Sequence, residues 1–279
     1  MNFGHAYTET EMASVDGMKR WTGRVALVTG ASSGIGQATV RALVRHGMRV
    51  VGCARHIKAI EEDARWLSED NSVTGSLHAI KCDLTQEEEI LAMFAEIKKN
   101  FGGVDVCVCN AGISHSGTLA SPIGILNGVT AKWRDMLDVN VLAVAICCRE
   151  AVKQMEEKGA MDGQLLVTNS MSGHRIQLKA TNFYSATKYA VTAMVEGIRR
   201  ELREKKCHIR IAQISPGIVE TEFRDRMFAD DDQEQARKLY RTMVPMSAQD
   251  IADSMLYVLQ APPHVQVHDI LLRPTEQRM

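Results

Sequence analysis

Short apolar runs alternate with longer amphipathic segments along most of this chain. The short runs are rich in valine, isoleucine and leucine, which is typical of strands buried on both faces. The longer segments repeat apolar residues at helical spacing, which predicts amphipathic helices. The expected strands are Val25–Thr29, Arg49–Cys53, Leu77–Lys81, Val104–Cys109, Gln164–Asn169, Ile209–Ile214 and Val267–Leu272. The expected helices include Gly34–His46, Gln86–Lys99, Lys132–Lys158, Asn182–Glu204 and Ala248–Leu259.

This alternation predicts an α/β fold, a Rossmann-type doubly wound parallel sheet of about seven strands with helices on both faces. Neither an internal repeat nor a linker is visible, so residues 21–279 are expected to form a single domain. Residues 1–20 are polar and acidic and are expected to be a disordered extension. Two stretches, Ser114–Gly128 and Glu220–Met246, interrupt the pattern. Such sheets bind ligands in the loops beyond their strand ends, so both stretches are expected to form walls of a substrate site.

Composition and charge disfavour several kinds of partner. Of the 279 residues, 45% are hydrophobic, which is enough for a large core, and the formal net charge is −1. A charge this close to zero gives no reason to expect a nucleic acid or an anionic membrane as partner. No apolar run is long enough to span a bilayer, and Met1–Met18 lacks the apolar core of a signal peptide. A cytoplasmic protein is therefore expected.

The seven cysteines are odd in number and are not spaced like the ligands of a zinc site. Cys107 and Cys109 alternate within an expected strand, and Cys147-Cys148 lies in an apolar helical run. We expect these residues to be small buried hydrophobic side chains in a reducing compartment, with no metal bound.

A glycine-rich loop, Thr29-Gly30-Ala31-Ser32-Ser33-Gly34-Ile35-Gly36, joins the first expected strand to the first expected helix. Glycines at a strand–helix junction let the backbone approach a pyrophosphate, whose charge is then stabilised by the helix N-terminus. The alternative is a tight turn that merely needs glycines. The flanking strand and helix favour the phosphate site.

Tyr184 and Lys188 lie four residues apart, so on a helix they share one face. A free phenol has a pKa of about 10, and a neighbouring cation favours the phenolate, which lowers that value toward working pH. A tyrosine of this kind can give a proton to a developing alkoxide. The spacing alone is common on ordinary helices, but the phosphate loop upstream makes it informative.

Further motifs occur in a fixed order between Val25 and Pro274. They are the glycine-rich loop, Asp83-Leu84, Cys109-Asn110-Ala111-Gly112, Asn140, Ser170, Tyr184 with Lys188, and Ser215-Pro216-Gly217. In these motifs the chain resembles the short-chain dehydrogenase/reductase family. Three more stretches, Val51–Arg55, Asn169–Arg175 and Leu272–Gln277, look like one subgroup, the SDR member 11 type, which also resembles insect farnesol dehydrogenases. That subgroup implies NADP-linked reduction of keto-steroids and related carbonyls.

The resemblance implies four catalytic roles. Tyr184 would donate the proton while hydride passes between nicotinamide and carbonyl carbon, and Lys188 would keep the phenol acidic and hold the nicotinamide ribose. Ser170 would polarise the carbonyl, although Ser172 is a competing hydroxyl and Ser170 could also be an ordinary turn residue at the strand end. Asn140 would hold a water that relays protons to Lys188; the alternatives are a helix kink or a buried structural amide.

The resemblance also implies a cofactor site. After the second strand, Ala54 stands where NAD-preferring relatives carry an acidic residue, and Arg55 and His56 follow. A guanidinium can hold a 2′-phosphate, which predicts NADP(H), unless Arg55 is only a solvated surface residue. The expected cofactor-binding residues are Gly30, Ser32, Ser33, Gly34, Ile35, Gly36, Arg55, His56, Asp83, Leu84, Asn110, Tyr184, Lys188, Pro216, Gly217, Val219 and Thr221.

One position of this set carries an alternative, and a position next to the set departs from the family. Asp83 is expected near the adenine, although it could instead cap the following helix. Cys109 departs from the family, which usually has asparagine there, whereas the cofactor-contacting asparagine is kept as Asn110. The change is expected to remove a side-chain bond of the central strand, worth about 1 kcal/mol, and to leave the chemistry intact.

Several residues lie where they could line an apolar substrate pocket, with the core as an equally weighted alternative: Phe183, Met171, His174, Met227 and Phe228. Such walls suit a bulky carbonyl such as a steroid, terpenoid or quinone. The alternatives are a reductase of small dicarbonyls, quinones or ketoacyl groups, and an inactive NADP-binding scaffold or redox sensor. The scaffold is disfavoured because Tyr184, Lys188 and Ser170 are all kept.

Two long expected helices, Lys132–Lys158 and Asn182–Glu204, carry apolar residues on more than one face. These include Val141, Val144, Ile146, Ala190, Val191 and Met194. One face must cover the sheet and the rest could pair with a second copy, so a homo-oligomer, a dimer or tetramer, is expected.

Overall fold

The computed structural model describes residues 17–115, 124–159, 162–176, 181–223 and 243–277. Seven parallel strands form one sheet in the order β3-β2-β1-β4-β5-β6-β7, which confirms the expected Rossmann-type fold in a single domain. The strands are β1 (Val25–Thr29), β2 (Arg49–Ala54), β3 (Ser76–Lys81), β4 (Val106–Cys109), β5 (Gln164–Thr168), β6 (Arg210–Pro216) and β7 (Asp269–Leu272).

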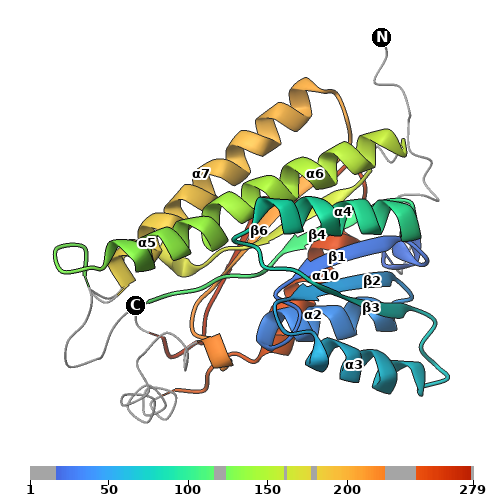
Figure 1. Ribbon diagram of the computed structural model, residues 1–279, viewed down its shortest axis with the longest axis horizontal. Coiled ribbons are helices and arrows are strands. Elements are labelled where there is room, and N and C mark those ends of the chain that lie inside the picture. Colours follow the sequence, from blue (N-terminus) through green and yellow to red (C-terminus); the bar gives the residue numbers. More distant parts are fainter. Residues whose placement is uncertain (1–16, 116–123, 160–161, 177–180, 224–242, 278–279) are drawn as a thin grey trace.

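Helices cover both faces of the sheet (Figure 1). On one face lie α4 (Glu87–Phe101), α6 (Ala143–Glu157) and α7 (Asn182–Glu204), which pack through one hydrophobic cluster. On the other face α2 (Gly34–Arg45), α3 (Lys58–Ser68) and α10 (Ala248–Gln260) pack through a second cluster. Side chains on alternate sides of each central strand enter the two clusters, which explains why these strands read as continuous apolar runs.

Most expected elements are present with bounds that differ by two residues or fewer, and those of β1 and α7 agree fully. Helix α3 was not expected, although its buried Ile60 and Leu67 face the sheet. The expected helix Lys132–Lys158 begins earlier and is interrupted: α5 (Thr130–Leu137) is followed by a π-helical segment, η2 (Asp138–Leu142), before α6.

The domain begins before residue 21. Lys19–Trp21 form a short 3-10 helix, η1, and the side chains of Met18 and Trp21 are buried. The Trp21 Nε1–H donates to the carbonyl of Leu259 at 2.8 Å, which ties this segment to the end of α10. The predicted boundary was therefore a few residues too late, because an isolated apolar residue in a polar stretch gives no periodic pattern. Residues 1–16 lie outside the described residues.

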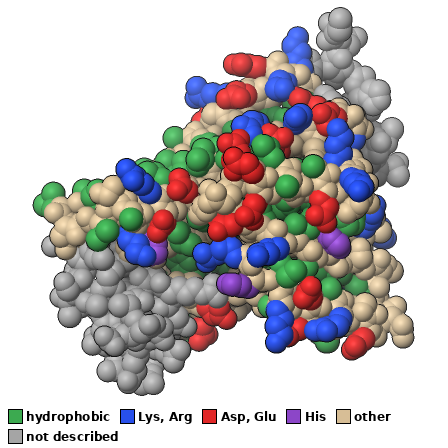
Figure 2. Space-filling model, in the orientation of Figure 1, with side chains coloured by type: hydrophobic (Ala, Val, Ile, Leu, Met, Phe, Trp, Pro, Cys, Tyr) green, Lys and Arg blue, Asp and Glu red, His purple; other side chains and the backbone are tan. Residues whose placement is uncertain are grey.

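The surface of the described residues mixes both signs of charge, as Figure 2 shows for one face. Within the described part of the chain, no helix is both long and apolar enough to cross a membrane. Six of the seven cysteines are buried and all seven are free thiols, which confirms the expected packing role. Cys109 lies among other thiols, with its Sγ 3.9 Å from both Cys107 Sγ and Cys148 Sγ.

The central strands are joined at their carboxyl ends by one amide side chain. Asn110, directly after β4, donates from Nδ2 to the carbonyl of Thr29 at 3.0 Å, and its Oδ1 accepts from Thr168 Oγ1 at 3.1 Å. These bonds connect the ends of β1, β4 and β5. The end of the central strand is thus held by Asn110, whose neighbour is the buried thiol Cys109.

Candidate active site

The glycine-rich loop forms a backbone cradle at the start of α2. Gly30 and Gly34 have φ angles of +65° and +55°, a region that favours glycine. A Cβ on Gly36 would overlap the Gly30 carbonyl and lie 2.5 Å from Asn110 Nδ2. The side chain of Ser33 makes no capping bond, so the first N–H groups of α2 are left for an anion. The cradle therefore fits the pyrophosphate of a dinucleotide.

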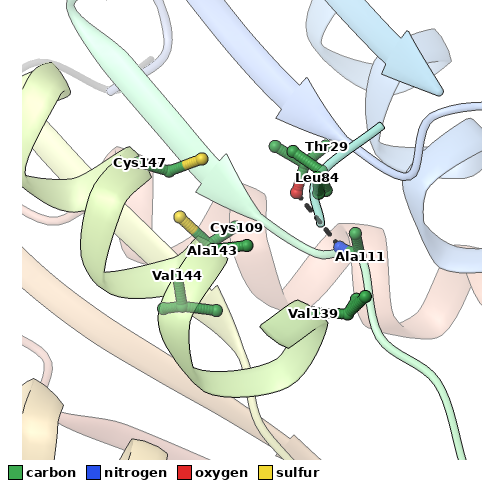
Figure 3. Close-up of a pocket in the computed structure, with 8 residues that line it drawn as sticks. All are labelled: Thr29, Leu84, Cys109, Ala111, Val139, Ala143, Val144 and Cys147. Carbon is green, nitrogen blue, oxygen red and sulfur yellow. Dashed lines mark hydrogen bonds between the residues drawn. The ribbon is translucent and has the colours of Figure 1, made fainter. Parts of the chain in front are cut away.

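A small, mostly apolar gap lies beneath this cradle (Figure 3). It is lined by Thr29, Leu84, Cys109, Ala111, Val139, Ala143, Val144 and Cys147. The hydroxyl of Thr29 accepts from the backbone N–H of Asn110 at 3.0 Å and of Ala111 at 3.1 Å. These bonds hold the loop after β4 against the end of β1. Leu84, expected to bind the cofactor, contributes to the packing of this gap.

The residues expected near the adenosine lie beyond β2 and β3. Arg55 and His56 follow β2 and are exposed. Asp83 accepts at Oδ1 from the N–H and hydroxyl of Thr85, at 3.0 and 2.9 Å, so it closes a turn and does not cap α4, whose N-cap is Gln86. The bond from the Thr85 N–H is the main cause of a lowered pKa of Asp83, and the charge of Arg55 adds to it. Arg55 and Asp83 are therefore neighbours at this edge.

The segment after β6 returns toward the glycine-rich loop. Pro216 ends β6, and the N–H of Gly217 donates to the carbonyl of Leu272 at 2.7 Å. Val219 forms a β-bridge with Met246. The side chain of Thr221 would be 3.1 Å from a Cβ placed on Gly34. These expected cofactor residues thus lie along one path from β6 to the cradle.

Ser170 and Tyr184 meet beyond the end of β5. Ser170 caps the short 3-10 helix η3 (Met171–Gly173), and its Oγ accepts from the N–H of Ser172 at 3.1 Å. Tyr184 lies in the first turn of α7, and the side chain of Ser170 acts on its phenol to lower the pKa. Of the two candidate hydroxyls, it is thus Ser170 that influences the phenol.

Lys188 is 4% exposed and donates from Nζ to the carbonyl of Thr168 at 2.8 Å. Its Nζ lies 5.7 Å from the centre of the Tyr184 ring. Burial lowers the pKa of Lys188 to about 8. Burial raises the pKa of Tyr184 to about 12, and the hydrogen bond with Ser170 opposes that increase. The expectation that Lys188 would lower the pKa of Tyr184 is therefore corrected: desolvation of the phenol dominates, and the ammonium is directed at a backbone carbonyl.

Asn140 lies in the π-helical segment η2 and is fully buried. Its Oδ1 accepts from the N–H of Ile113 at 2.8 Å, and its Nδ2 donates to the Ile113 carbonyl and to Thr187 Oγ1, at 2.8 and 3.1 Å. Both amide hydrogens are thus used within the protein, which fits a structural amide at a helix irregularity, and the expected role of Asn140 in holding a relay water stays a prediction. A Cβ on Gly112 would lie 3.5 Å from Asn140 Oδ1 and 3.8 Å from Lys188 Nζ, which shows how close these groups are.

Aromatic residues border the catalytic tyrosine. Phe183 stacks on Trp133 of α5 with ring centres 4.8 Å apart, and Tyr184 contacts Phe223 with ring centres 5.9 Å apart. The sequence reasoning missed Trp133 and Phe223. Phe223 follows the expected cofactor residue Thr221 closely, which was the only available hint.

Two other expected pocket residues have different roles. Met171 is completely buried, and its Sδ accepts from Gln277 Nε2 at 3.6 Å. His174 contacts Ser215 and Asp269 beneath the sheet edge. The remaining two, Met227 and Phe228, lie outside the described residues, as do residues 116–123 and 224–242 of the two expected substrate walls.

Comparison with known proteins gives a consistent result. The short chain dehydrogenase family matches residues 24–232. Dehydrogenase/reductase SDR family member 11 of Gallus gallus is 54% identical over 261 residues, covering 93% of this chain and 99% of the relative. Farnesol dehydrogenase of Aedes aegypti is 39% identical over 262 residues, covering 94% of this chain and all of the relative (100%).

Solved structures agree with these relatives. An alcohol dehydrogenase from the archaeon Thermococcus sibiricus, complexed with 5-hydroxy-NADP, superposes with a TM-score of 0.75 at 27% identity. The superposition covers 92% of this chain and 98% of that chain.

Proposed function

Because this chain belongs to the short-chain dehydrogenase family of oxidoreductases, whose cofactor is NAD(P)(H), we propose that it is an NADPH-dependent carbonyl reductase. It reduces the ketone of a bulky apolar substrate, or oxidises the corresponding secondary alcohol. The observation that carries this proposal is the meeting of the Ser170 hydroxyl with the Tyr184 phenol beside the buried Lys188 ammonium.

The bound nicotinamide supplies the hydride, and the chain's own residues manage the carbonyl oxygen. Ser170 holds that oxygen by a hydrogen bond, and Tyr184 gives it a proton. With a pKa of about 12, the phenol carries this proton throughout the neutral range. After the transfer, the hydroxyl of Ser170 stabilises the phenolate, and the ammonium of Lys188 would hold the nicotinamide ribose. Asn140 positions the start of α7 through its bond to Thr187.

The choice of NADP(H) over NAD(H) rests on the edge beyond β2. Arg55 and His56 are exposed there, next to Ala54, where an acidic residue would repel a 2′-phosphate. Asp83, a carboxylate at this edge, accepts hydrogen bonds from Thr85. The exposed guanidinium of Arg55 can pair with the phosphate.

The substrate class is supported by the aromatic pairs around Tyr184. Trp133 with Phe183, and Phe223 with Tyr184, offer flat apolar surface to a large carbonyl compound. The relative named farnesol dehydrogenase is, by its name, an enzyme of an isoprenoid alcohol. Keto-steroids and isoprenoid carbonyls are therefore the proposed substrates.

The homo-oligomer also belongs to the proposal, with a change in the residues that form it. Val144, Ile146 and Val191, three of the apolar residues named on these helices, belong to the face that is buried against the sheet. Leu137, Leu142 and Tyr189 are 43%, 54% and 44% exposed on α5, η2 and α7 and are proposed to form the pairing face. Apolar side chains gather over α5 and the start of α6 in Figure 2. Sedimentation at micromolar concentration should show a dimer or tetramer, and a monomer alone would contradict this part. The cytoplasmic location stays a prediction.

The test is NADPH consumption by purified protein against keto-steroids, a terpenoid aldehyde, quinones and small diketones, with NADH in parallel. Tyr184→Phe should abolish turnover and keep cofactor binding, since only the proton donor is lost. Tyr257→Phe is the matched control, because this tyrosine is 61% exposed on α10. Activity that survives in Tyr184→Phe would refute the mechanism. Turnover confined to small diketones or quinones would favour the alternative of a reductase of small carbonyl compounds. NADPH binding without turnover of any carbonyl would favour the alternative of an inactive scaffold.

A further inference from the structure

The turn that carries Ser170 is anchored to the last two strands by a histidine. His174 follows η3, and its Nε2 lies 3.0 Å from Ser215 Oγ on β6 and 3.0 Å from Asp269 Oδ2 on β7. Ser215 Oγ donates to Asp269 Oδ1 at 2.7 Å, and Gln213 Nε2 donates to Asp269 Oδ2 at 2.9 Å. The Asp269 carboxylate, at the start of β7, therefore interacts with three side chains, those of His174, Gln213 and Ser215.

The direction of the histidine bond follows from the hydrogens available. Ser215 has a single hydroxyl hydrogen, which is directed at Asp269. Asp269 as a carboxylate has no hydrogen to give. His174 Nε2 must therefore carry a hydrogen and donate it. This holds for the neutral ring in its Nε2–H form and for the charged ring, so the anchor does not depend on the protonation of Nδ1.

A second set of bonds joins the same turn to the catalytic helix. Thr192 Oγ1 on α7 lies 3.1 Å from the carbonyl oxygen of Gly173 and 3.2 Å from that of Lys188, so its one hydroxyl hydrogen is shared between them. Asn169 Nδ2 donates to Thr192 Oγ1 and to Gln213 Oε1, both at 2.8 Å. The turn is thus held between α7, which carries Tyr184 and Lys188, and β6 with β7.

The turn packs closely on the catalytic helix, so the anchor to β6 and β7 is what fixes its orientation about that contact. A Cβ on Gly173 would lie 2.7 Å from Asn169 Nδ2 and 2.8 Å from the Lys188 carbonyl, so this backbone packs closely on α7. The hydroxyl of Ser170 takes its direction from the same turn, through the N–H of Ser172 at 3.1 Å. Loss of the anchor on the β7 side would let the turn rotate about its contact with α7 and move Ser170 relative to Tyr184.

We propose that His174, held by Asp269, is a positioning residue that sets the Ser170 hydroxyl against the Tyr184 phenol. This inference rests on the proposed function, because it assigns the histidine a place in that reaction. It also assigns a role to β7, a strand far from Ser170 in the sequence. His174 contacts neither reacting group, so its effect is on the rate of the chemical step and not on cofactor binding.

The variants are His174→Ala, His174→Gln and Asp269→Asn, measured as kcat and KM with the best carbonyl substrate and as NADPH affinity. His174→Ala and Asp269→Asn should lower kcat roughly tenfold to a hundredfold, since displacing a catalytic group costs rate steeply, with NADPH affinity unchanged. His174→Gln keeps an amide N–H that can reach Asp269 and should recover most of the rate. The matched control is His78→Ala, which removes an exposed histidine, 3.4 Å from Glu96, at the far edge of the sheet.

Amide hydrogen exchange tests the anchor without turnover. The N–H groups of Ser172, Gly173 and His174 all bond within the turn. They should exchange faster in His174→Ala, stay protected in His174→Gln and be unaffected in His78→Ala. If the wild type reduces no carbonyl, the proposed function fails and this exchange pattern alone decides whether the anchor exists. An active His174→Ala with wild-type kcat, or unchanged exchange in the turn, would overturn the inference.

Discussion

Replacing Lys188 with methionine should make the protein more stable at neutral pH while removing its activity. The ammonium of Lys188 is buried, and its one hydrogen bond within the described residues is to the carbonyl of Thr168. Burial lowers the pKa of Lys188 from its ordinary 10.5 to about 8, so the fold disfavours the charged form. Methionine has a similar length and no charge to desolvate.

The size of the effect follows from the pKa. A decrease from 10.5 to about 8 corresponds to a cost of about 3 kcal/mol for the charged lysine in the folded state. Losing the hydrogen bond to Thr168 costs about 1 kcal/mol in the opposite sense, so the variant should gain about 2 kcal/mol in free energy of unfolding at pH 7.

The gain should depend on pH in a defined direction. Below about pH 8 the lysine is charged in both folded and unfolded chains, and the full cost is present. Between about 8 and 10.5 the folded protein loses its proton first, so the wild type becomes more stable as pH rises. Near pH 10 the advantage of Lys188→Met should have almost vanished, to within about 1 kcal/mol.

Urea unfolding without nucleotide, at pH 7 and near pH 10, measures both the gain in free energy of unfolding and its loss at high pH. Lys99→Met is the control, because that lysine is exposed on α4 and should show no pH-dependent difference. A Lys188→Met variant less stable than the wild type at pH 7 would refute the reasoning. A stability difference that stays constant with pH would refute it equally.

Three further predictions concern the reaction and its cofactor. The kcat/KM of carbonyl reduction should fall above about pH 8, as Lys188 loses its charge, and a profile that stays flat to about pH 10 would contradict this role. Gly36→Ala should weaken NADPH binding about tenfold or more in a fluorescence titration, because its Cβ would overlap the Gly30 carbonyl. The control is Gly197→Ala, since a Cβ at that position would have no neighbour within 4 Å. Arg55→Ala should reduce the preference for NADPH over NADH by roughly tenfold to a hundredfold in kcat/KM, and an unchanged ratio would assign the 2′-phosphate to other residues.

The parts of the fold that were predictable depend on local pattern. The run Val25–Thr29 and the helix Asn182–Glu204 agree with the structure in both bounds, because buried apolar runs and long amphipathic segments carry their own period. Helix α3 was missed because nearly half of its residues are charged and only a few apolar side chains mark its inner face. The π-helical segment around Asn140 was visible only as a polar break in an apolar helix.

For the candidate site too, residues whose role depends on close sequence neighbours could be predicted, and residues whose partners are distant in the sequence could not. The glycine-rich loop and the pair Tyr184 and Lys188 could be found because their chemistry depends on residues close together in sequence. The role of His174 could not, because its partners Ser215 and Asp269 lie on strands far along the chain. Nothing local distinguishes a histidine that lines a pocket from one that anchors a turn.

The sequence alone determined the order of strands and helices, the phosphate cradle and the tyrosine–lysine pair, since each needs only neighbouring residues and a repeating pattern. The tertiary structure decided how far each group is desolvated and which partner it meets. It turned the expected lowering of the Tyr184 pKa into an increase, and it directed Lys188 toward Thr168. Burial and long-range contacts arise only when distant segments pack together, and these set the electrostatics of the site.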